Sequence, residues 1–209
     1  MRAEFDFRQG TSRQTLLVFI AVLAAAGIVF GVLASRTLTL DQQDNLASDL
    51  ARYALTAEAG QLADAGDTLR DRALLHGKWV LAVWLLGVTV VGAPFVLVLD
   101  FLKGVLIGFS FGVLIQAYGW KGMLFALAAM APGNLLVLPA LLFASVSSVA
   151  FALHVFKYRL MQPTGSLREP LLAHASTALT MLALSAGGAF IEAYAAPKLI
   201  GWAAPLLAS

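Results

Sequence analysis

Residues 123–156 read MLFALAAMAPGNLLVLPALLFASVSSVAFALHVF, and His154 is the one ionisable side chain in this stretch. A soluble domain carries a charged residue at about one position in four, so the stretch is suited to lipid rather than to water. Two membrane-crossing helices and a turn need about 40 residues, which is more than it provides. Because Pro132-Gly133-Asn134 interrupts it, we expect a half-length segment, Met123–Ala131, that dips into the bilayer and returns, followed by a full span over Leu135–Phe156. One long kinked helix is the alternative.

The whole 209-residue chain has the same apolar character, with 60% hydrophobic and 12% charged residues and a mean hydropathy of +0.83. These values exclude a disordered chain and argue against a water-soluble fold. Four more runs can cross a bilayer core of about 30 Å: they are Leu16–Ala34, Trp79–Leu99, Phe101–Tyr118 and Leu171–Ile191. The first run exceeds the apolar region of a cleaved signal peptide, so we expect an uncleaved anchor. The predicted fold is all-α: a single membrane domain, 1–209, with five transmembrane helices.

The basic residues predict the orientation. If the N-terminus is cytoplasmic, lysine and arginine are about twice as dense on that side as on the other, as the positive-inside rule requires. The cytoplasmic pieces would be 1–15, 100–103 and 157–170. We therefore expect a multi-pass protein of the cell membrane with its C-terminus outside. The net charge of +2 is too small to indicate nucleic acid, so the lipid bilayer is the first expected partner.

The longest polar segment, Ser35–Lys78, is expected to form an extracytoplasmic helical loop. Apolar residues recur at helical spacing behind Asp41, a plausible N-cap, and Asp67–His76 predicts a second short helix. The apolar positions Leu46, Leu50 and Tyr53 are the candidate partner-binding residues. A solvated hairpin packed on the bundle is the plainer interpretation, and the two are compatible. A 44-residue segment is too small for a separate enzyme domain.

The chain has few residues suited to catalysis or to metal binding. It has no cysteine and three histidines, so no metal site, cofactor or cysteine nucleophile is expected. The predicted spans place every ionisable residue at or near a membrane interface, including Asp100, Lys103, His174 and Glu192. Gly108-Phe109-Ser110-Phe111-Gly112 fits G-x-S-x-G, but that motif needs a strand-to-helix turn, which an apolar helical run does not supply. The sequence therefore predicts that the protein is not an enzyme.

Small residues at four-residue spacing indicate close helix packing. Gly104, Gly108 and Gly112 repeat on one helix, and Gly27 and Gly31 repeat the pattern in the first span. Four-residue spacing places them on one face, where two backbones can approach closely. The pattern does not say whether the neighbouring helix belongs to the same chain or to a second copy, so a homo-oligomer stays open. Asp100 and Lys103, three residues apart, are expected to pair at the membrane edge.

Several of these segments together resemble the stage II sporulation protein M family. The matching runs are Trp84–Gly87, Gly92-Ala93-Pro94, Phe101–Phe109, Gly119–Gly122, Ala131–Leu135 and Pro139. The resemblance extends in order from about residue 16 to 190. The positions that match the family pattern are Asp100, Lys103, Gly104, Gly108, Lys121, Gly122, Pro132 and Asn134. We assign these residues to packing and assembly.

The resemblance implies a role in engulfment of the forespore, at the mother-cell membrane of the sporulation septum. It implies a non-enzymatic scaffold that recruits two peptidoglycan hydrolases, sporulation proteins D and P. The alternative, from a different class, is the membrane subunit of a transporter or exporter, which the interruption at Pro132 favours slightly.

Overall fold

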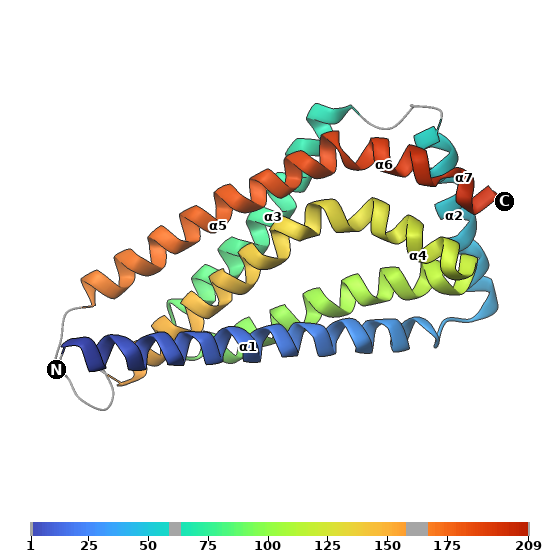
Figure 1. Cartoon of the computed structure of the whole chain (residues 1–209). Helices are drawn as coiled ribbons and strands as arrows, with labels where there is room; N and C mark the ends of the chain where they lie inside the picture. The colour runs from blue at the N-terminus through green and yellow to red at the C-terminus, as the bar shows by residue number, and fades with distance from the viewer. Residues whose placement is uncertain (1, 59–63, 158–166, 209) are drawn as a thin grey trace.

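The computed structural model describes residues 2–58, 64–157 and 167–208, and every regular element within these ranges is a helix. The elements are α1 (Arg2–Ser35), α2 (Leu40–Glu58), α3 (Ala65–Gly87), α4 (Gly92–Val155), α5 (Arg168–Tyr194), α6 (Ala196–Ala203) and α7 (Pro205–Ala208). The long helices run beside one another, while α2, α6 and α7 gather at one end, the α2 end (Figure 1). Among the described residues, three helices are long and apolar enough to cross a membrane: α1 from Arg13, α4 and α5.

Helix α4 consists of two arms that fold back on each other. Gly119 separates them and has a φ of 59°, in the left-handed region that favours glycine. A Cβ on Gly122 would overlap the carbonyl oxygen of Leu114, so a glycine there lets the second arm begin against the first. In Figure 1 the two arms lie beside each other after this turn, green for the first arm and yellow for the second.

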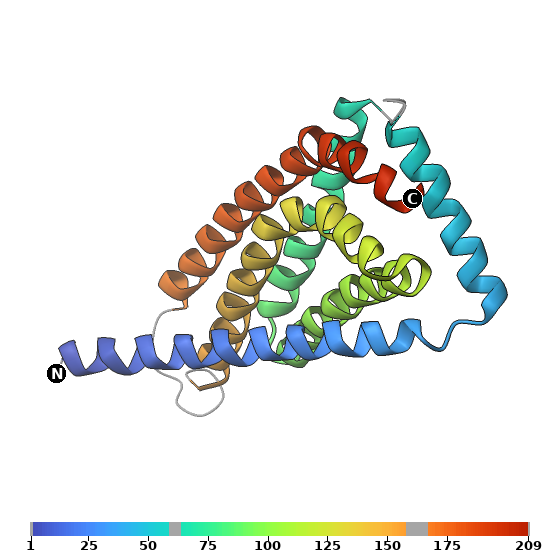
Figure 2. The ribbon, with the colours of Figure 1, turned by 45° about the vertical axis from the view of Figure 1, so that its right-hand side comes forward.

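The second arm is one continuous helix that passes through Pro132 and Pro139. The expectation of a half-length segment at Met123–Ala131 is therefore wrong, and the kinked helix is what forms. A proline removes one backbone donor and bends a helix without necessarily ending it. The side-chain amide of Asn134, two residues after Pro132, donates to the carbonyl of Met130 in the preceding turn at 2.9 Å. Figure 2 shows the resulting bend in the yellow stretch.

The expected span Trp79–Leu99 is also wrong, because a turn divides it. Helix α3 ends at Gly87 and α4 begins at Gly92, and the hydroxyl of Thr89 both donates to the Leu86 carbonyl and accepts from the Gly92 amide, at 3.0 Å each. Three of the four turn residues are valines and the fourth is Thr89. All four are β-branched, and β-branched residues form helices less readily than most others. Helix α3 therefore starts in the segment expected to be a loop, and the predicted helix Asp67–His76 is its first part.

Within the described ranges, the buried apolar side chains form two clusters. The larger packs Ile20 of α1 with Val80 and Val83 of α3, Val96 of the first α4 arm and buried residues of the second arm. The smaller lies at the α2 end, where Ile200 of α6 packs with residues on both sides of the α4 turn. The C-terminal helices are thus part of the fold rather than an appended tail.

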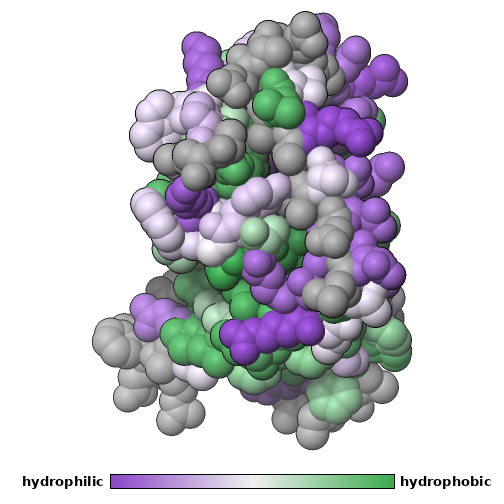
Figure 3. Space-filling view, turned by 90° about the vertical axis from the view of Figure 1, so that its right-hand side faces the viewer, coloured by the Kyte–Doolittle hydropathy of each residue, from purple (hydrophilic) through white to green (hydrophobic). Residues whose placement is uncertain are grey.

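Helix α2 packs against α4, α6 and α7. Its N-cap is Thr39 rather than the expected Asp41: the Thr39 amide donates to the Gln42 side chain at 3.0 Å, and the Gln42 amide donates to the Thr39 hydroxyl at 3.4 Å. This reciprocal pair is a capping box. Figure 3 looks onto the α2 end, where many hydrophilic side chains gather. Residues 59–63 of the predicted loop lie outside the described ranges.

Candidate functional site

The glycines expected to pack helices lie at the contact between α1 and the first arm of α4. A Cβ on Gly27 or Gly31 would overlap the carbonyl oxygens of Phe101 and Val105. On the facing helix, a Cβ on Gly108 would overlap the Ile28 carbonyl oxygen. Gly104 and Gly112 are equally tight. The neighbouring helix therefore belongs to the same chain, and this glycine face is used inside the bundle.

Near the end of α1, a pair of hydrogen bonds through Ser35, which we call the polar clasp, joins α1 to α4. The side-chain amide of Gln116 donates to the Ser35 hydroxyl at 2.6 Å, and this hydroxyl donates to the Val32 carbonyl at 2.8 Å. Ser35 is fully buried. The clasp fixes the register of α1 on α4.

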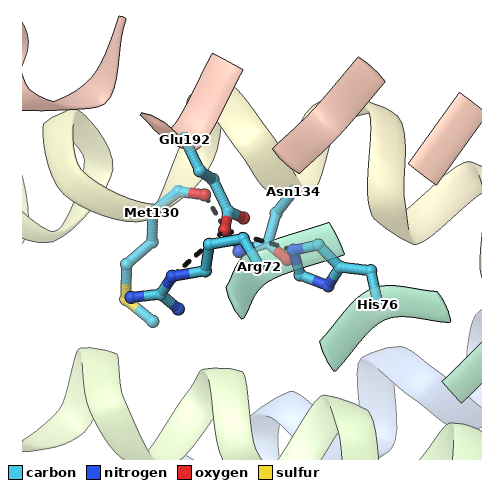
Figure 4. A network of polar contacts seen from close by, with 5 residues as sticks. All are labelled: Arg72, His76, Met130, Asn134 and Glu192. Atoms are coloured by element: carbon cyan, nitrogen blue, oxygen red, sulfur yellow. Dashed lines mark hydrogen bonds and ion pairs between the residues drawn. The ribbon is translucent and has the colours of Figure 1, made fainter. Parts of the chain in front are cut away.

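A charged cluster joins α3 to α5 in the half of the bundle nearer α2. One carboxylate oxygen of Glu192 lies 3.1 Å from His76 Nε2 and 3.7 Å from Arg72 Nε. The His76 side chain is 4% exposed and that of Glu192 is 13% exposed. The stem of Glu192 fills the space that a side chain on Gly133 would occupy. Figure 4 shows this carboxylate between the side chains of Arg72 and His76, beside Asn134.

Asp100 and Lys103 lie within α4, eight and eleven residues from its first residue, so they do not mark a break between two helices. The pair expected between them does not form either. Asp100 is 1% exposed and accepts a hydrogen bond from the Ser145 hydroxyl at 2.8 Å. Lys103 Nζ instead lies 5.4 Å from the ring centre of Trp79, a cation–π contact. The second carboxylate oxygen of Asp100 has no hydrogen-bond partner among the described residues.

His174 is buried as well, although the sequence placed it at an interface. Its Nε2 lies 3.3 Å from the Trp84 carbonyl and its Nδ1 lies 2.9 Å from the Ser147 hydroxyl. A carbonyl can only accept, so Nε2 carries the hydrogen and a neutral ring accepts from Ser147 at Nδ1. The ring of Phe151 stacks on the imidazole at 5.1 Å.

The other predicted site residues are spread through the fold. Lys121 and Gly122 follow the α4 turn, and Pro132 and Asn134 form its bend. Leu46 is half-buried on α2, whereas the side chains of Leu50 and Tyr53 lie outside the described part. The Ser110 hydroxyl donates to the Leu106 carbonyl of its own helix at 3.0 Å, which is a local helical bond rather than the arrangement of a nucleophile.

The charged cluster was missed by sequence reasoning because its partners are far apart in the chain. His76 and Glu192 are 116 positions apart, and each looks interfacial when its own neighbours are considered. The available signal was the four-residue spacing of Arg72 and His76, which puts both on one helix face. The described residues contain no group of three or more side chains suited to a metal ion.

Comparison with known families identifies a match over most of the chain. The family model described as stage II sporulation protein M matches residues 17–197. No curated protein and no solved structure matches the chain. The matched region begins in α1 and ends in α6, so it contains the glycine contact, both arms of α4 and the charged cluster.

Proposed function

This chain belongs to the stage II sporulation protein M family, a family of sporulation-related membrane proteins, and we propose that it is a non-enzymatic scaffold of the engulfment machinery. It recruits and positions peptidoglycan hydrolases, sporulation proteins D and P, at the mother-cell membrane of the sporulation septum. The family is not a known enzyme family. The observation that carries the proposal is the seating of α2 against α4, α6 and α7. A partner bound to α2 would be held at a fixed position relative to the membrane-crossing helices.

The proposed topology has five passes: α1, α3, the two arms of α4, and α5. These segments lie beside one another in Figure 1, and α2 lies at the end opposite the N-terminus. Arginines 2, 8 and 13 precede the first pass, and Lys157 and Arg168 flank the connection between α4 and α5. Both groups fall at the same end, as expected for a cytoplasmic face. The α2 end is then extracytoplasmic, where peptidoglycan hydrolases work.

Tight packing supports a scaffold rather than a moving carrier. At the α1–α4 contact the glycines leave no room for a Cβ, so the two backbones touch along several turns. Such a contact holds a bundle in one arrangement and gives α2 and the C-terminal helices a rigid base.

Co-purification tests the proposal. The detergent-solubilised protein is expected to retain the two hydrolases, and the double substitution Leu50→Asp with Tyr53→Asp is expected to release them without preventing membrane insertion. Ser48→Asp, at an exposed position on the same helix, is the matched control and should retain both enzymes. Unchanged recruitment by the double variant would remove α2 from the mechanism. Retention of a nucleotide-binding subunit in place of the hydrolases would favour the exporter alternative.

A further inference from the structure

Polar groups follow one another along the contact of α3 with α4 and α5, although the sequence analysis assigned the ionisable ones among them to the polar loop or to membrane interfaces. They form three levels, which we call the polar ladder. The first level is Arg72, His76 and Glu192; the second is Lys103, Asp100 and Ser145; the third is Ser148, Ser147, His174 and Trp84. Ionisable groups inside a membrane are costly and are typical of ion paths and proton relays.

The first level is open to the outside of the protein. The Arg72 side chain is 50% exposed and lines a surface hollow of about 450 Å³ together with Thr68, Asp71 and Lys78. Behind it, His76 is 3% exposed, and its Nδ1 has no hydrogen-bond partner in the described part of the chain. Arg72 therefore connects the hollow that it lines to the buried pair, because its Nε lies 3.7 Å from the Glu192 carboxylate that contacts His76.

The second level lies within the apolar core. Asp100 sits one helical turn beyond Val96, in the region where Val80 and Val83 pack against α4. It keeps one oxygen bonded to Ser145 and the other unpaired within the described ranges. Lys103, one turn away on the same helix, reaches the ring of Trp79 at 5.4 Å, and Trp79 lies one turn beyond His76 on α3, so the first two levels adjoin along that helix. From α1, the residues packed here are the apolar Leu16, Leu17 and Ile20.

The third level leads to the opposite end of the bundle. The Ser148 hydroxyl donates to the Val83 carbonyl at 3.0 Å, and Ser147 contacts His174. The indole N–H of Trp84 is a third buried polar group without a partner among the described residues. Trp84 lies three residues before the end of α3, so this level is within one helical turn of the connection at 88–91.

We propose that the polar ladder conducts protons between the two faces of the membrane. From Arg72 to Trp84 the ladder covers twelve residues of α3, about 18 Å at 1.5 Å per residue, which is more than half of a hydrocarbon core of about 30 Å. A proton taken up at Glu192 and His76 passes to Asp100, moves on to His174 and leaves beside the turn. Each group returns to its starting protonation state, so the net event is the transfer of one proton.

The ladder fits a proton better than a metal ion. Hard divalent cations such as Ca²⁺ need six or more oxygen ligands, whereas two oxygen-bearing side chains, Asp100 and Ser145, meet at the second level of the described structure. Imidazole and carboxyl groups can each take up and release one proton, and both kinds occur along the ladder.

Proton flux into liposomes tests this inference. The purified full-length chain is reconstituted into phospholipid vesicles that contain a pH-sensitive dye, and a potassium gradient with valinomycin provides an inside-negative potential. We expect the interior to acidify faster than in protein-free vesicles. Wild-type vesicles that acidify no faster than the protein-free ones would overturn the proposal, whatever the variants do.

Variants then locate the path. Asp100→Asn is expected to reduce the flux to the level of protein-free vesicles, and Ser145→Ala, which leaves the carboxyl in place, is expected to slow it. Glu169→Gln, at an exposed position in the first turn of α5, is the control and should conduct as the wild type does. Wild-type flux in both the Asp100 and Ser145 variants would remove the ladder from the path. None of these measurements depends on hydrolase recruitment, so the scaffold and the conductance can fail separately.

Discussion

Glu192 connects three helices through one side chain. It belongs to α5, contacts Arg72 and His76 of α3, and packs on Gly133 of α4. Replacing it with alanine leaves His76 without this partner in a buried position, and an unsatisfied buried polar group costs about 1–3 kcal/mol. We expect Glu192→Ala to lower the unfolding free energy in detergent by about that amount. Chemical denaturation of the purified protein measures it.

The matched control for this prediction is Glu169→Ala, which removes a carboxylate from the same helix at an exposed position. Its effect should be clearly smaller, because solvent screens an exposed charge. Equal losses in the two variants would mean that the contacts of Glu192 with α3 contribute nothing to stability.

Individual side-chain contacts were also the features that the sequence predicted least well. Local spacing identified the small-residue faces of Gly27 and Gly108 because helical periodicity brings every fourth residue to one side. It could not pair His76 with Glu192, since that contact depends on how α3 and α5 cross. The same limit applies to His174, whose burial comes from Trp84 and Phe151 on other helices.

At the scale of elements, substitution by alanine is expected to affect Gly108 and Gly187 differently. Gly108→Ala places a methyl group against the Ile28 carbonyl, so α1 and α4 must separate. Gly187→Ala meets its nearest atom, on Leu136, at 3.6 Å, an ordinary contact. Alanine favours a helix over glycine by about 1 kcal/mol, whereas overpacking costs about 1–3 kcal/mol.

We therefore expect opposite signs: Gly108→Ala lowers the melting temperature in detergent, and Gly187→Ala leaves it unchanged or raises it. Thermal unfolding followed by fluorescence decides between them. A stabilised Gly108→Ala protein would show that the α1–α4 contact tolerates a wider spacing.

The turn at 88–91 explains why the element boundaries were mispredicted. Its residues, Val88, Thr89, Val90 and Val91, are apolar or nearly so, and hydropathy cannot distinguish a short apolar turn from the middle of a span. The charges at Asp100 and Lys103 looked like a boundary for the same reason. Backbone hydrogen bonding, through the Thr89 hydroxyl, marks the actual break.

Cysteine labelling tests this boundary, and the chain has no native cysteine to interfere. Thr89→Cys, at an exposed turn position, should react with a water-soluble maleimide in opened membranes. Leu102→Cys is also exposed on the protein surface, at 43%, but it should be protected because lipid covers it. The reverse pattern would restore a single span over residues 79–99.

At the scale of the whole molecule, composition was sufficient for the class but not for the arrangement. An apolar, charge-poor chain predicts a helical membrane protein, because lipid requires every backbone group to be bonded internally. The family resemblance, from residue 16 to 190, agrees with the matched region 17–197. The C-terminal helices were not anticipated, since their role depends on packing against the α4 turn.

The number of membrane passes depends on α3, which is less apolar than the three helices that meet the length and hydropathy requirements. If α3 crosses, α2 and the turn at 88–91 lie on opposite sides of the membrane, because α3 is the helix that connects them. Ser48→Cys on α2 should then react with an impermeant maleimide in intact cells, and Thr89→Cys should react only after the membrane is opened. Both positions are exposed in the fold, so protection of either reflects the membrane rather than the protein. Reaction of both in intact cells would place α3 outside the bilayer, which would also leave the polar ladder without a membrane to cross.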